Sequence, residues 1–160
     1  MLKWLWITAI VIIADLYTKS LASGMLQMYQ PVAVFPGFNF TLMHNKGAAF
    51  SFLADQSGWQ RWFFSVIAVV VSVAIIVWLK KLPKDQVWMA IALSLILGGA
   101  IGNVYDRISL GYVVDFLDVY YGSSHWPAFN IADSAISVGA VMILIDAIRG
   151  DKKPDTAESP

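Results

Sequence analysis

The chain has 160 residues, of which 58% are hydrophobic and 14% are charged, and its formal net charge is zero. A soluble domain carries about 25% charged residues, so this composition indicates an integral membrane protein. A neutral chain gives no indication of nucleic-acid binding. The sequence contains no cysteine, which excludes disulfides, thiolate metal sites and a cysteine nucleophile. It also excludes an acceptor cysteine for lipid modification of the chain itself.

Four apolar runs approach the length of about 20 residues that a helix needs to cross a bilayer. The predicted spans are 2–21, 62–79, 87–105 and 131–148. We therefore expect an all-α membrane protein in which four transmembrane helices form a single integral domain over 1–160. The segments 22–61 and 106–130 join the spans on the outer side, and 149–160 is a polar cytoplasmic tail.

The first apolar run also resembles a signal peptide, because Lys3 precedes it and residues 21–24 could serve as a cleavage site. Asp15 interrupts what should be the uncharged centre of the run. If the segment is kept, Asp15 and Lys19 stand on one helix face at a spacing of i,i+4 and can pair. The alternative is a lysine that reaches to the membrane surface beside a neutralising partner.

The pattern changes between the first two spans. Apolar residues alternate with others over 32–34 and 38–42, and Pro36-Gly37 separates the two runs. This pattern predicts a short hairpin or a small sheet. Its aromatic side chains would suit the headgroup region of a membrane. Asn45 and Gly47 follow, in a stretch of small residues that allows close approach of the backbone.

The distribution of basic residues predicts the orientation of the spans. Seven basic residues fall on one side of four spans: Lys3, Lys80, Lys81, Lys84, Arg149, Lys152 and Lys153. The other side has Lys19, Lys46, Arg61 and Arg107. Because basic residues accumulate in the cytoplasm, we expect both termini there. Polar residues from four separate segments then converge towards the outer face of the membrane.

The third span combines small residues with polar ones. Gly98 and Gly102 form a G-x-x-x-G pattern, which favours close helix packing within the chain or between chains. Asn103 and Arg107 follow on one helix face. Arg107 is either an interface anchor or a group that holds a loop carbonyl or a lipid phosphate. Asp106 is expected to pair with Arg107 or to face the headgroups.

Two aspartates flank the start of the fourth span. Asp115 lies shortly before the span, and Asp133 opens it. A carboxylate at the centre of a membrane helix costs about 2.5–3.5 kcal/mol on insertion scales, and two carboxylates brought together repel each other. Helix capping accounts for Asn130 or for Asp133, but not for both together with Asp115. We therefore hypothesise an aspartyl hydrolase at a membrane surface, and we expect Asp118 to be a loop carboxylate without a role.

Other chemistries find less support in the sequence. The two histidines, His44 and His125, lack an H-E-x-x-H or similar spacing, so we expect no metal site. No G-x-S-x-G or S-x-x-K pattern indicates a serine hydrolase. A small proton-coupled transporter remains an alternative, although it favours a carboxylate near the midplane and an internal repeat. A structural membrane subunit would explain the glycines but not the converging Asp and Asn residues.

Taken together, five blocks of the chain resemble the signature blocks of the bacterial lipoprotein signal peptidases, or signal peptidase II. They are D-x-x-T-K from Asp15, N-x-G-A-A-F from Asn45, G-G-A-x-G-N-x-x-D-R from Gly98, V-V-D-F from Val113 and F-N-x-A-D from Phe129. The blocks follow the order of the family and extend from the first span to the fourth. Leu16 is a small departure, since many members carry glutamine there.

The resemblance implies an aspartyl endopeptidase of the bacterial plasma (inner) membrane. Such an enzyme removes the signal peptide from prolipoproteins whose acceptor cysteine already carries diacylglycerol. Nothing in the sequence calls for a metal or an organic cofactor, so we expect none. The implied fold is four transmembrane helices with a small extracytoplasmic β-cradle, and we expect a monomer with its active site towards the outer face. Asp115 and Asp133 match the catalytic dyad. The supporting positions are Asp15, Lys19, Asn45, Gly47, Asn103, Arg107 and Asn130.

Overall fold

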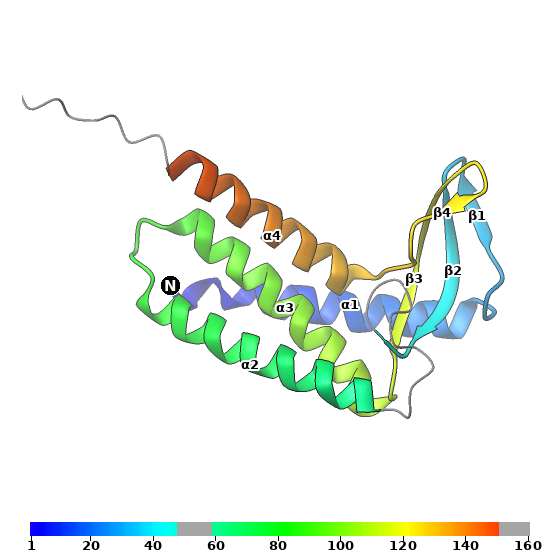
Figure 1. The fold of residues 1–160 in the computed structure, drawn as a ribbon, viewed down its shortest axis with the longest axis horizontal. Coiled ribbons are helices and arrows are strands. Elements are labelled where there is room, and N and C mark those ends of the chain that lie inside the picture. Colours follow the sequence, from blue (N-terminus) through cyan, green and yellow to red (C-terminus); the bar gives the residue numbers. More distant parts are fainter. Residues whose placement is uncertain (48–58, 151–160) are drawn as a thin grey trace, which may run out of the picture.

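A computed structural model of the chain describes residues 1–47 and 59–150. These residues form a helical bundle with a sheet at one end (Figure 1). The helices are the short 3-10 helix η1 (Leu2–Trp4), α1 (Leu5–Met25), α2 (Trp59–Lys81), α3 (Val87–Ser109) and α4 (Ile131–Gly150). The strands are β1 (Val32–Phe35), β2 (Phe38–Asn45), β3 (Val113–Tyr121) and β4 (Ser124–His125).

Helices α2, α3 and α4 each contain one predicted span and extend past it, and η1 together with α1 covers the first span in the same way. Within the described residues, the four helical segments Leu2–Met25, Trp59–Lys81, Val87–Ser109 and Ile131–Arg149 are long and apolar enough to cross a membrane. The extension of α3 to Ser109 places Asp106 and Arg107 in the helix rather than in a loop. Residues 48–50 of the motif that begins at Asn45, and residues 151–160 of the tail, lie outside the described residues.

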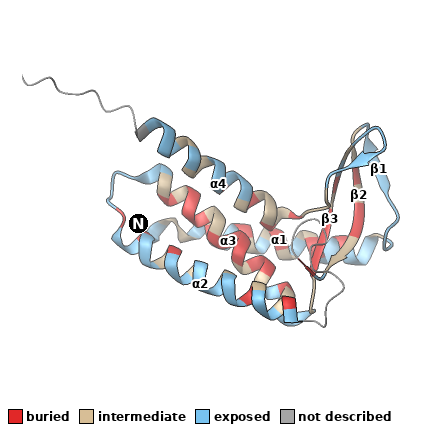
Figure 2. Ribbon diagram, in the orientation of Figure 1, coloured by how far each residue is buried: buried red, intermediate tan, exposed pale blue. Residues whose placement is uncertain are grey.

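Helix α3 is the centre of the bundle and packs against each of the other three helices. Of its most apolar stretch, 61% is buried, whereas the value is 17% for α2 and for α4 (Figure 2). The small residues of α3 make this close packing possible. A Cβ atom on Gly98 would lie 2.7 Å from Val11 Cβ, and one on Gly99 would clash with the carbonyl oxygen of Ala132. The G-x-x-x-G segment therefore packs within the chain, against α1 and α4.

The sheet has four antiparallel strands in the order β1-β2-β3-β4. The predicted hairpin is confirmed as β1 and β2, which turn at Pro36-Gly37, and Gly37 has the positive φ of +93° that glycine tolerates. The sheet is larger than predicted, because β3 and β4 come from 106–130. Residues 113–121 are rich in β-branched and aromatic side chains, which favour a strand. Both Met1 and the end of α4 lie at the end of the bundle away from the sheet (Figure 1).

The two ends of the bundle have different interiors. Away from the sheet, the core is apolar and is formed largely by Ile75, Leu79, Leu93 and Leu97. Near the sheet, the buried side chains include charged and amide groups from α1, α3, β3 and the start of α4. Buried polar groups are stable only when they are hydrogen-bonded, so this end must contain an organised network.

Candidate active site

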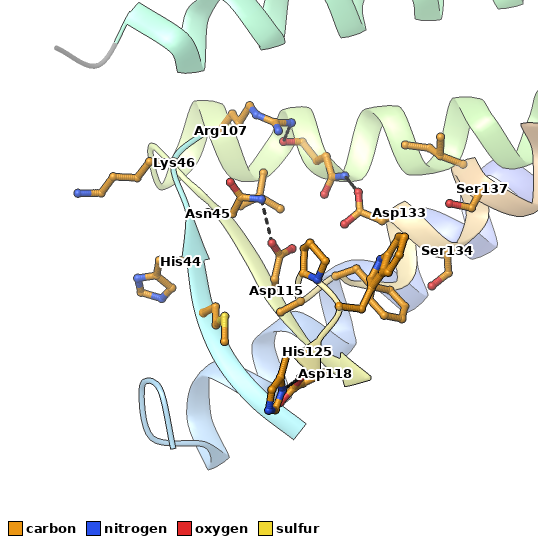
Figure 3. Close-up of a pocket in the computed structure, with 18 of the residues that line it drawn as sticks. His44, Asn45, Lys46, Arg107, Asp115, Asp118, His125, Asp133, Ser134 and Ser137 are labelled. Carbon is orange, nitrogen blue, oxygen red and sulfur yellow. Dashed lines mark hydrogen bonds and ion pairs between the residues drawn. The ribbon is translucent and has the colours of Figure 1, made fainter. Parts of the chain in front are cut away.

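An open groove of about 1220 Å³ lies beside β2, β3 and the first turns of α4 (Figure 3). Its lining includes both aspartates of the predicted dyad. Asp115 points into it from β3, and Asp133 faces the same space from α4 (Figure 3). Asn45, Asn103 and Arg107 also line it. The predicted convergence of polar residues from separate segments is thus present in the structure.

Asp115 is 2% exposed and is bound through both of its carboxylate oxygens. Asn45 Nδ2 donates to Oδ2 at 3.0 Å from the neighbouring strand β2, and Asn130 Nδ2 donates to Oδ1 at 2.7 Å. The main-chain N–H of Gly47 donates to Asn45 Oδ1 at 3.0 Å, which fixes the orientation of that amide. The carboxylate therefore accepts hydrogen bonds from two neutral amides and is held in one orientation.

The position of Asn130 follows from a short extension of the sheet. Phe129 pairs with Leu117 of β3, through hydrogen bonds of 2.9 and 3.0 Å. This pairing places the next residue, Asn130, alongside Asp115. Asn130 Oδ1 then accepts the main-chain N–H of Asp133 at 2.9 Å, in the manner of a helix N-cap. The same amide of Asn130 therefore caps α4, as helix capping predicted, and also binds the carboxylate of Asp115.

Two amides connect the two aspartates. Asn130 Nδ2 donates to Asn103 Oδ1 at 3.2 Å, and Asn103 Nδ2 donates to Asp133 Oδ1 at 2.8 Å. Asn130 is completely buried and Asn103 nearly so. The resulting chain runs from Asp115 through Asn130 and Asn103 to Asp133. Because every link is a side-chain hydrogen bond, the relative orientation of the two carboxylates is fixed by this network.

The surroundings of Asp115 favour its protonated form. Burial, and then repulsion from the carboxylate of Asp133, raise the pKa of Asp115 from 3.8 to about 7. The hydrogen bonds from Asn45 and Asn130 lower that pKa, but by less than the other effects raise it. Near neutral pH the carboxyl group of Asp115 can therefore either release or accept a proton.

The predicted pair of Asp15 and Lys19 is confirmed. Their nitrogen–oxygen distance is 2.7 Å, and the two side chains are 0% and 3% exposed. The alternative of a lysine that reaches the membrane surface is therefore wrong. Lys19 Nζ also donates to Asn103 Oδ1 at 3.0 Å. It pairs with Asp106 at 2.9 Å, so the expectation that Asp106 pairs with Arg107 or faces the headgroups is wrong.

Arg107 lines the groove, and its contacts with the described residues are weak. Its Nη1 donates to the carbonyl of Asn103, one turn earlier in α3, at 3.4 Å. Its guanidinium lies 5.6 Å from the ring centroid of Phe64 on α2. A carbonyl contact was one of the predicted roles, but the carbonyl belongs to the same helix and not to a loop. The guanidinium remains next to the groove.

The structure differs most from the sequence-based expectation at Asp118, which was expected to be a loop carboxylate without a role. It lies in β3 rather than in a loop, and it is 2% exposed. Thr41 Oγ1 donates to its Oδ2 at 2.8 Å, Asn39 Nδ2 donates to the same oxygen at 3.2 Å, and His125 Nδ1 lies 2.7 Å from Oδ1. Burial raises the pKa of Asp118, but the hydrogen bonds from His125, Thr41 and Asn39 outweigh it and hold that pKa below 3.8.

Asp118 therefore ties β2 and β4 to β3. The alternation of Asn39 and Thr41 along one face of the hairpin was the signal in the sequence for a buried polar partner. Within residues 1–47 and 59–150, no group of three or more His, Cys, Asp and Glu side chains is placed to hold a metal ion. The expectation that the chemistry uses no metal stays a prediction.

The fold and the site together define a multi-pass membrane protein with a pair of carboxylates beside an open groove. Paired carboxylates that share a proton are able to activate water for attack on an amide. A family model described as Signal peptidase (SPase) II matches residues 7–149. The chain therefore belongs to the signal peptidase II family, a family of proteases, and the resemblance seen in the sequence blocks is confirmed.

Individual relatives agree with this assignment. The lipoprotein signal peptidase of Alteromonas mediterranea is 55% identical over 155 residues, which cover 96% of this chain and 85% of that protein. The lipoprotein signal peptidase of Pseudomonas aeruginosa is 54% identical over 158 residues, which cover 98% and 94% of the two chains. Both similarities extend over nearly the whole chain.

Two solved structures share the fold. A bacterial membrane enzyme determined by the in meso method at 2.3 Å resolution has a TM-score of 0.82 and 31% identity, and the match covers 99% of this chain and 94% of that one. A second, determined by the same method at 1.9 Å resolution, has a TM-score of 0.79 and 31% identity over 91% and 92%. The four helices and the small sheet are thus the arrangement of a known type of membrane enzyme.

Proposed function

We propose that this protein is a membrane aspartyl endopeptidase that removes the signal peptide from diacylglyceryl-modified prolipoproteins and cleaves before the lipidated cysteine. The observation that carries the proposal is the amide-linked pair of Asp115 and Asp133 beside the groove. Membership of the signal peptidase II family supports it, as do the relatives named lipoprotein signal peptidase.

In the proposed reaction, Asp115 and Asp133 share one proton and hold a water between them. The ionised carboxylate takes a proton from the water as its oxygen attacks the scissile carbonyl carbon. The protonated carboxyl donates a hydrogen bond to the carbonyl oxygen, which carries negative charge in the tetrahedral intermediate. A proton then passes to the leaving amine as the carbon–nitrogen bond breaks. The pair titrates as a unit, so the proton belongs to both residues.

The remaining site residues orient this pair and the substrate. Asn103 and Asn130 fix the carboxylates, and Asn45, oriented by Gly47, holds the second oxygen of Asp115. Arg107 would hold the substrate backbone or the lipid-bearing end, and its weak contacts with the described residues beside the groove support this role. A backbone carbonyl and a phosphate both accept hydrogen bonds from a guanidinium.

We further propose a setting in the bacterial plasma (inner) membrane, with both termini in the cytoplasm and the groove and sheet on the outer side. In support, Met1 and the end of α4 lie at the end of the bundle opposite the sheet (Figure 1). Lys80 and Lys81, at the end of α2, add basic charge to that side. The partners are prolipoprotein substrates and membrane lipid, and the enzyme acts as a monomer without a metal.

The test is a cleavage assay with the purified full chain in detergent, with EDTA throughout. The substrate is one prolipoprotein, presented with and without diacylglycerol on its cysteine. Cleavage immediately before the lipidated cysteine, absent without the lipid and absent in Asp115→Asn, is the expected result. A well-folded sample that leaves the lipidated substrate intact would overturn the proposal. Proton flux by the same sample in liposomes would then favour the transporter alternative.

A further inference from the structure

Lys19 lies at the centre of a buried ion cluster that joins α1 and α3. Its ammonium nitrogen is 2.7 Å from Asp15 Oδ2 and 2.9 Å from Asp106 Oδ2. All three side chains are almost completely buried. Two carboxyl groups share one ammonium group inside the bundle, and buried groups of this kind are stable only where further hydrogen-bond donors bind them.

The further donors are main-chain N–H groups next to the two aspartates of the dyad. Asp15 Oδ1 accepts the N–H of Ala132 at 2.9 Å, and Ala132 immediately precedes Asp133. Asp106 Oδ2 accepts the N–H of Val114 at 3.1 Å, and Val114 immediately precedes Asp115. Each carboxylate of the ion cluster therefore holds the backbone beside one carboxylate of the site.

We propose that Asp106 is a positioning residue for Asp115, in the same way that Asp15 is a positioning residue for Asp133. Lys19 binds both Asp15 and Asp106 and fixes the position of these two side chains relative to each other. The arrangement fixes the separation of the dyad through the main chain, in addition to the amides that fix its orientation. The inference rests on the proposed function, because it gives Asp106 a role in the same reaction. Asp106 acts through Val114 and does not touch the substrate.

The separation of the two aspartates needs such a device because they belong to different elements. Asp115 lies in β3, which is paired mainly with β2, and the register there includes His44 opposite Val114. Asp133 lies in α4, which packs on α3. The pairing of Phe129 with Leu117 and the amide network connect the sheet to the start of α4 directly. The contacts of Asp15 and Asp106 add a second connection, through α1 and α3. A displacement of 1 Å at a reacting pair can lower the rate by about 100-fold.

The geometry also predicts how two substitutions of Asp106 differ. A single oxygen, Oδ2, receives both the Lys19 ammonium and the Val114 N–H. The amide oxygen of an asparagine is able to accept both, but without the negative charge that makes such hydrogen bonds short and strong. The methyl group of an alanine accepts neither. Asp106→Asn should therefore retain part of the tether, and Asp106→Ala should lose it.

The experiment compares the parent, Asp106→Ala, Asp106→Asn and a control, Thr8→Val, as full chains in detergent with lipidated prolipoprotein. The control removes a buried hydrogen bond between α1 and α3, from Thr8 Oγ1 to the Ser94 carbonyl at 2.8 Å, about two helical turns from Asp15. The readouts are kcat, KM and the pH dependence of kcat/KM. Circular dichroism and Tm report on folding.

We expect Asp106→Ala to lower kcat by about 100-fold with little change in KM, and to shift the pH at which kcat/KM falls. The pH shift is expected because a displaced Asp115 changes its distances to the charged groups that face it, which are Asp133 from α4, Lys19 from α1 and Arg107 from α3. Asp106→Asn should show the same changes to a smaller extent. Thr8→Val should lower Tm but keep the parent kcat and pH profile.

A folded Asp106→Ala variant with the parent kcat and pH profile would overturn the inference, whether or not its Tm falls as in Thr8→Val. If Asp106→Ala yields no folded protein, the kinetics of Asp106→Asn decide by the same criteria. A parent enzyme that does not cleave would count against the proposed function instead. The positioning role is then tested by ¹³C NMR titration of Asp115, whose midpoint should move in Asp106→Asn; an unchanged midpoint would contradict the role.

Discussion

Asp115 and Asp118 lie on the same strand and are equally inaccessible to solvent, at 2% exposed each, yet their pKa values shift in opposite directions. Burial and repulsion from Asp133 raise the pKa of Asp115 to about 7. The pKa of Asp118 is below its ordinary value, because the hydrogen bonds that it receives outweigh the effect of burial. One carboxyl group can hold a proton at neutral pH, and the other stays ionised.

The difference lies in the partners and in how deeply each carboxyl group lies among other protein atoms, which is greater for Asp115. Asp115 receives neutral amides and lies near a second carboxylate. Asp118 accepts hydrogen bonds from a hydroxyl and an amide, and it also contacts the imidazole of His125, which is positively charged when protonated. Burial disfavours the charged form in both cases, and the neighbours decide whether the charge survives. Strand β3 thus carries one carboxylate suited to proton transfer and one suited to holding the sheet together.

The largest effect should come from removing the proton-transfer groups. Asp115→Asn and Asp133→Asn should each lower kcat by about 10⁴-fold, the upper range for general acid–base groups, while the protein remains folded. Asp118→Asn, on the same strand as Asp115, should keep most of the activity. Cleavage of a lipidated prolipoprotein, followed by gel shift, measures all three. Near-normal turnover in Asp115→Asn or in Asp133→Asn would remove that residue from the dyad.

A smaller effect should come from crowding the site without changing a charge. A Cβ atom on Gly102 would lie 2.6 Å from Asp15 Oδ2, so Gly102→Ala must displace the carboxylate that holds Ala132. Overpacking of this kind costs about 1–3 kcal/mol, and both Tm and kcat should fall. Gly24→Ala is the control, because nothing lies within 4 Å of its added Cβ. Equal kinetics for the two variants would show that the position of Asp15 does not matter.

The pH dependence of cleavage should follow Asp115. Because its pKa is raised to about 7, the pair loses its shared proton as the pH rises through that value, and kcat/KM should fall on the alkaline side. In Asp133→Asn the repulsion is absent, so the pKa of Asp115 should be lower than in the parent. A ¹³C NMR titration of the Asp115 carboxyl group measures both states. A parent midpoint near 3.8 would contradict the assignment.

The smallest effects should appear in how the free energy of unfolding depends on pH, with opposite signs for Asp118 and Asp115. The pKa of Asp118 is depressed by folding, so its contribution is present above 3.8 and is lost as the pH falls through the lower folded value. Asp118→Asn should lower the stability at neutral pH by about 1–2 kcal/mol, and the gap to the parent should close in acid. Thermal unfolding between pH 3 and pH 8 measures this gap, and a constant gap would contradict it.

For Asp115 the folded pKa is the higher one, so the native state binds more protons than the unfolded state between 3.8 and about 7. Stability should therefore decrease as the pH rises through this window. Asp115→Asn should lack that decrease and should be at least as stable as the parent above pH 7. Thermal unfolding of the parent and of Asp115→Asn over the same pH series measures this difference. If the parent becomes more stable than Asp115→Asn as the pH rises from 3.8 to about 7, the prediction is wrong.

The local features of the fold could be predicted from the sequence. Long apolar runs define α1 to α4, the alternation around Pro36-Gly37 defines the first hairpin, and the i,i+4 spacing of Asp15 and Lys19 defines their pair. In each case the geometry is set within a few residues. The placement of Asp115 and Asp133 beside the fourth span made them candidates, the family blocks match them to the dyad, and the structure brings both to one groove.

The errors concern contacts between distant segments. Asp106 was expected to pair with its neighbour Arg107 or to face the headgroups. Its partner Lys19 comes from α1 instead, and only the packing of α1 on α3 brings the two together. Asp118 finds its partners on β2 and β4, so its role depends on the strand pairing of β3. The composition of 113–121 could have indicated that strand, but not the register that buries Asp118.

Helix α4 lies at the periphery of the helical bundle, and this position affects how the enzyme would meet its substrate. Only 17% of its most apolar stretch is buried, and it carries Asp133 at its first turn, beside the groove. A lipid-anchored peptide can approach such a face sideways, by diffusion within the bilayer plane. Encounter rates would then depend on the number of substrates per lipid and not on their bulk concentration. Adding empty detergent micelles at constant enzyme and substrate should slow cleavage by surface dilution.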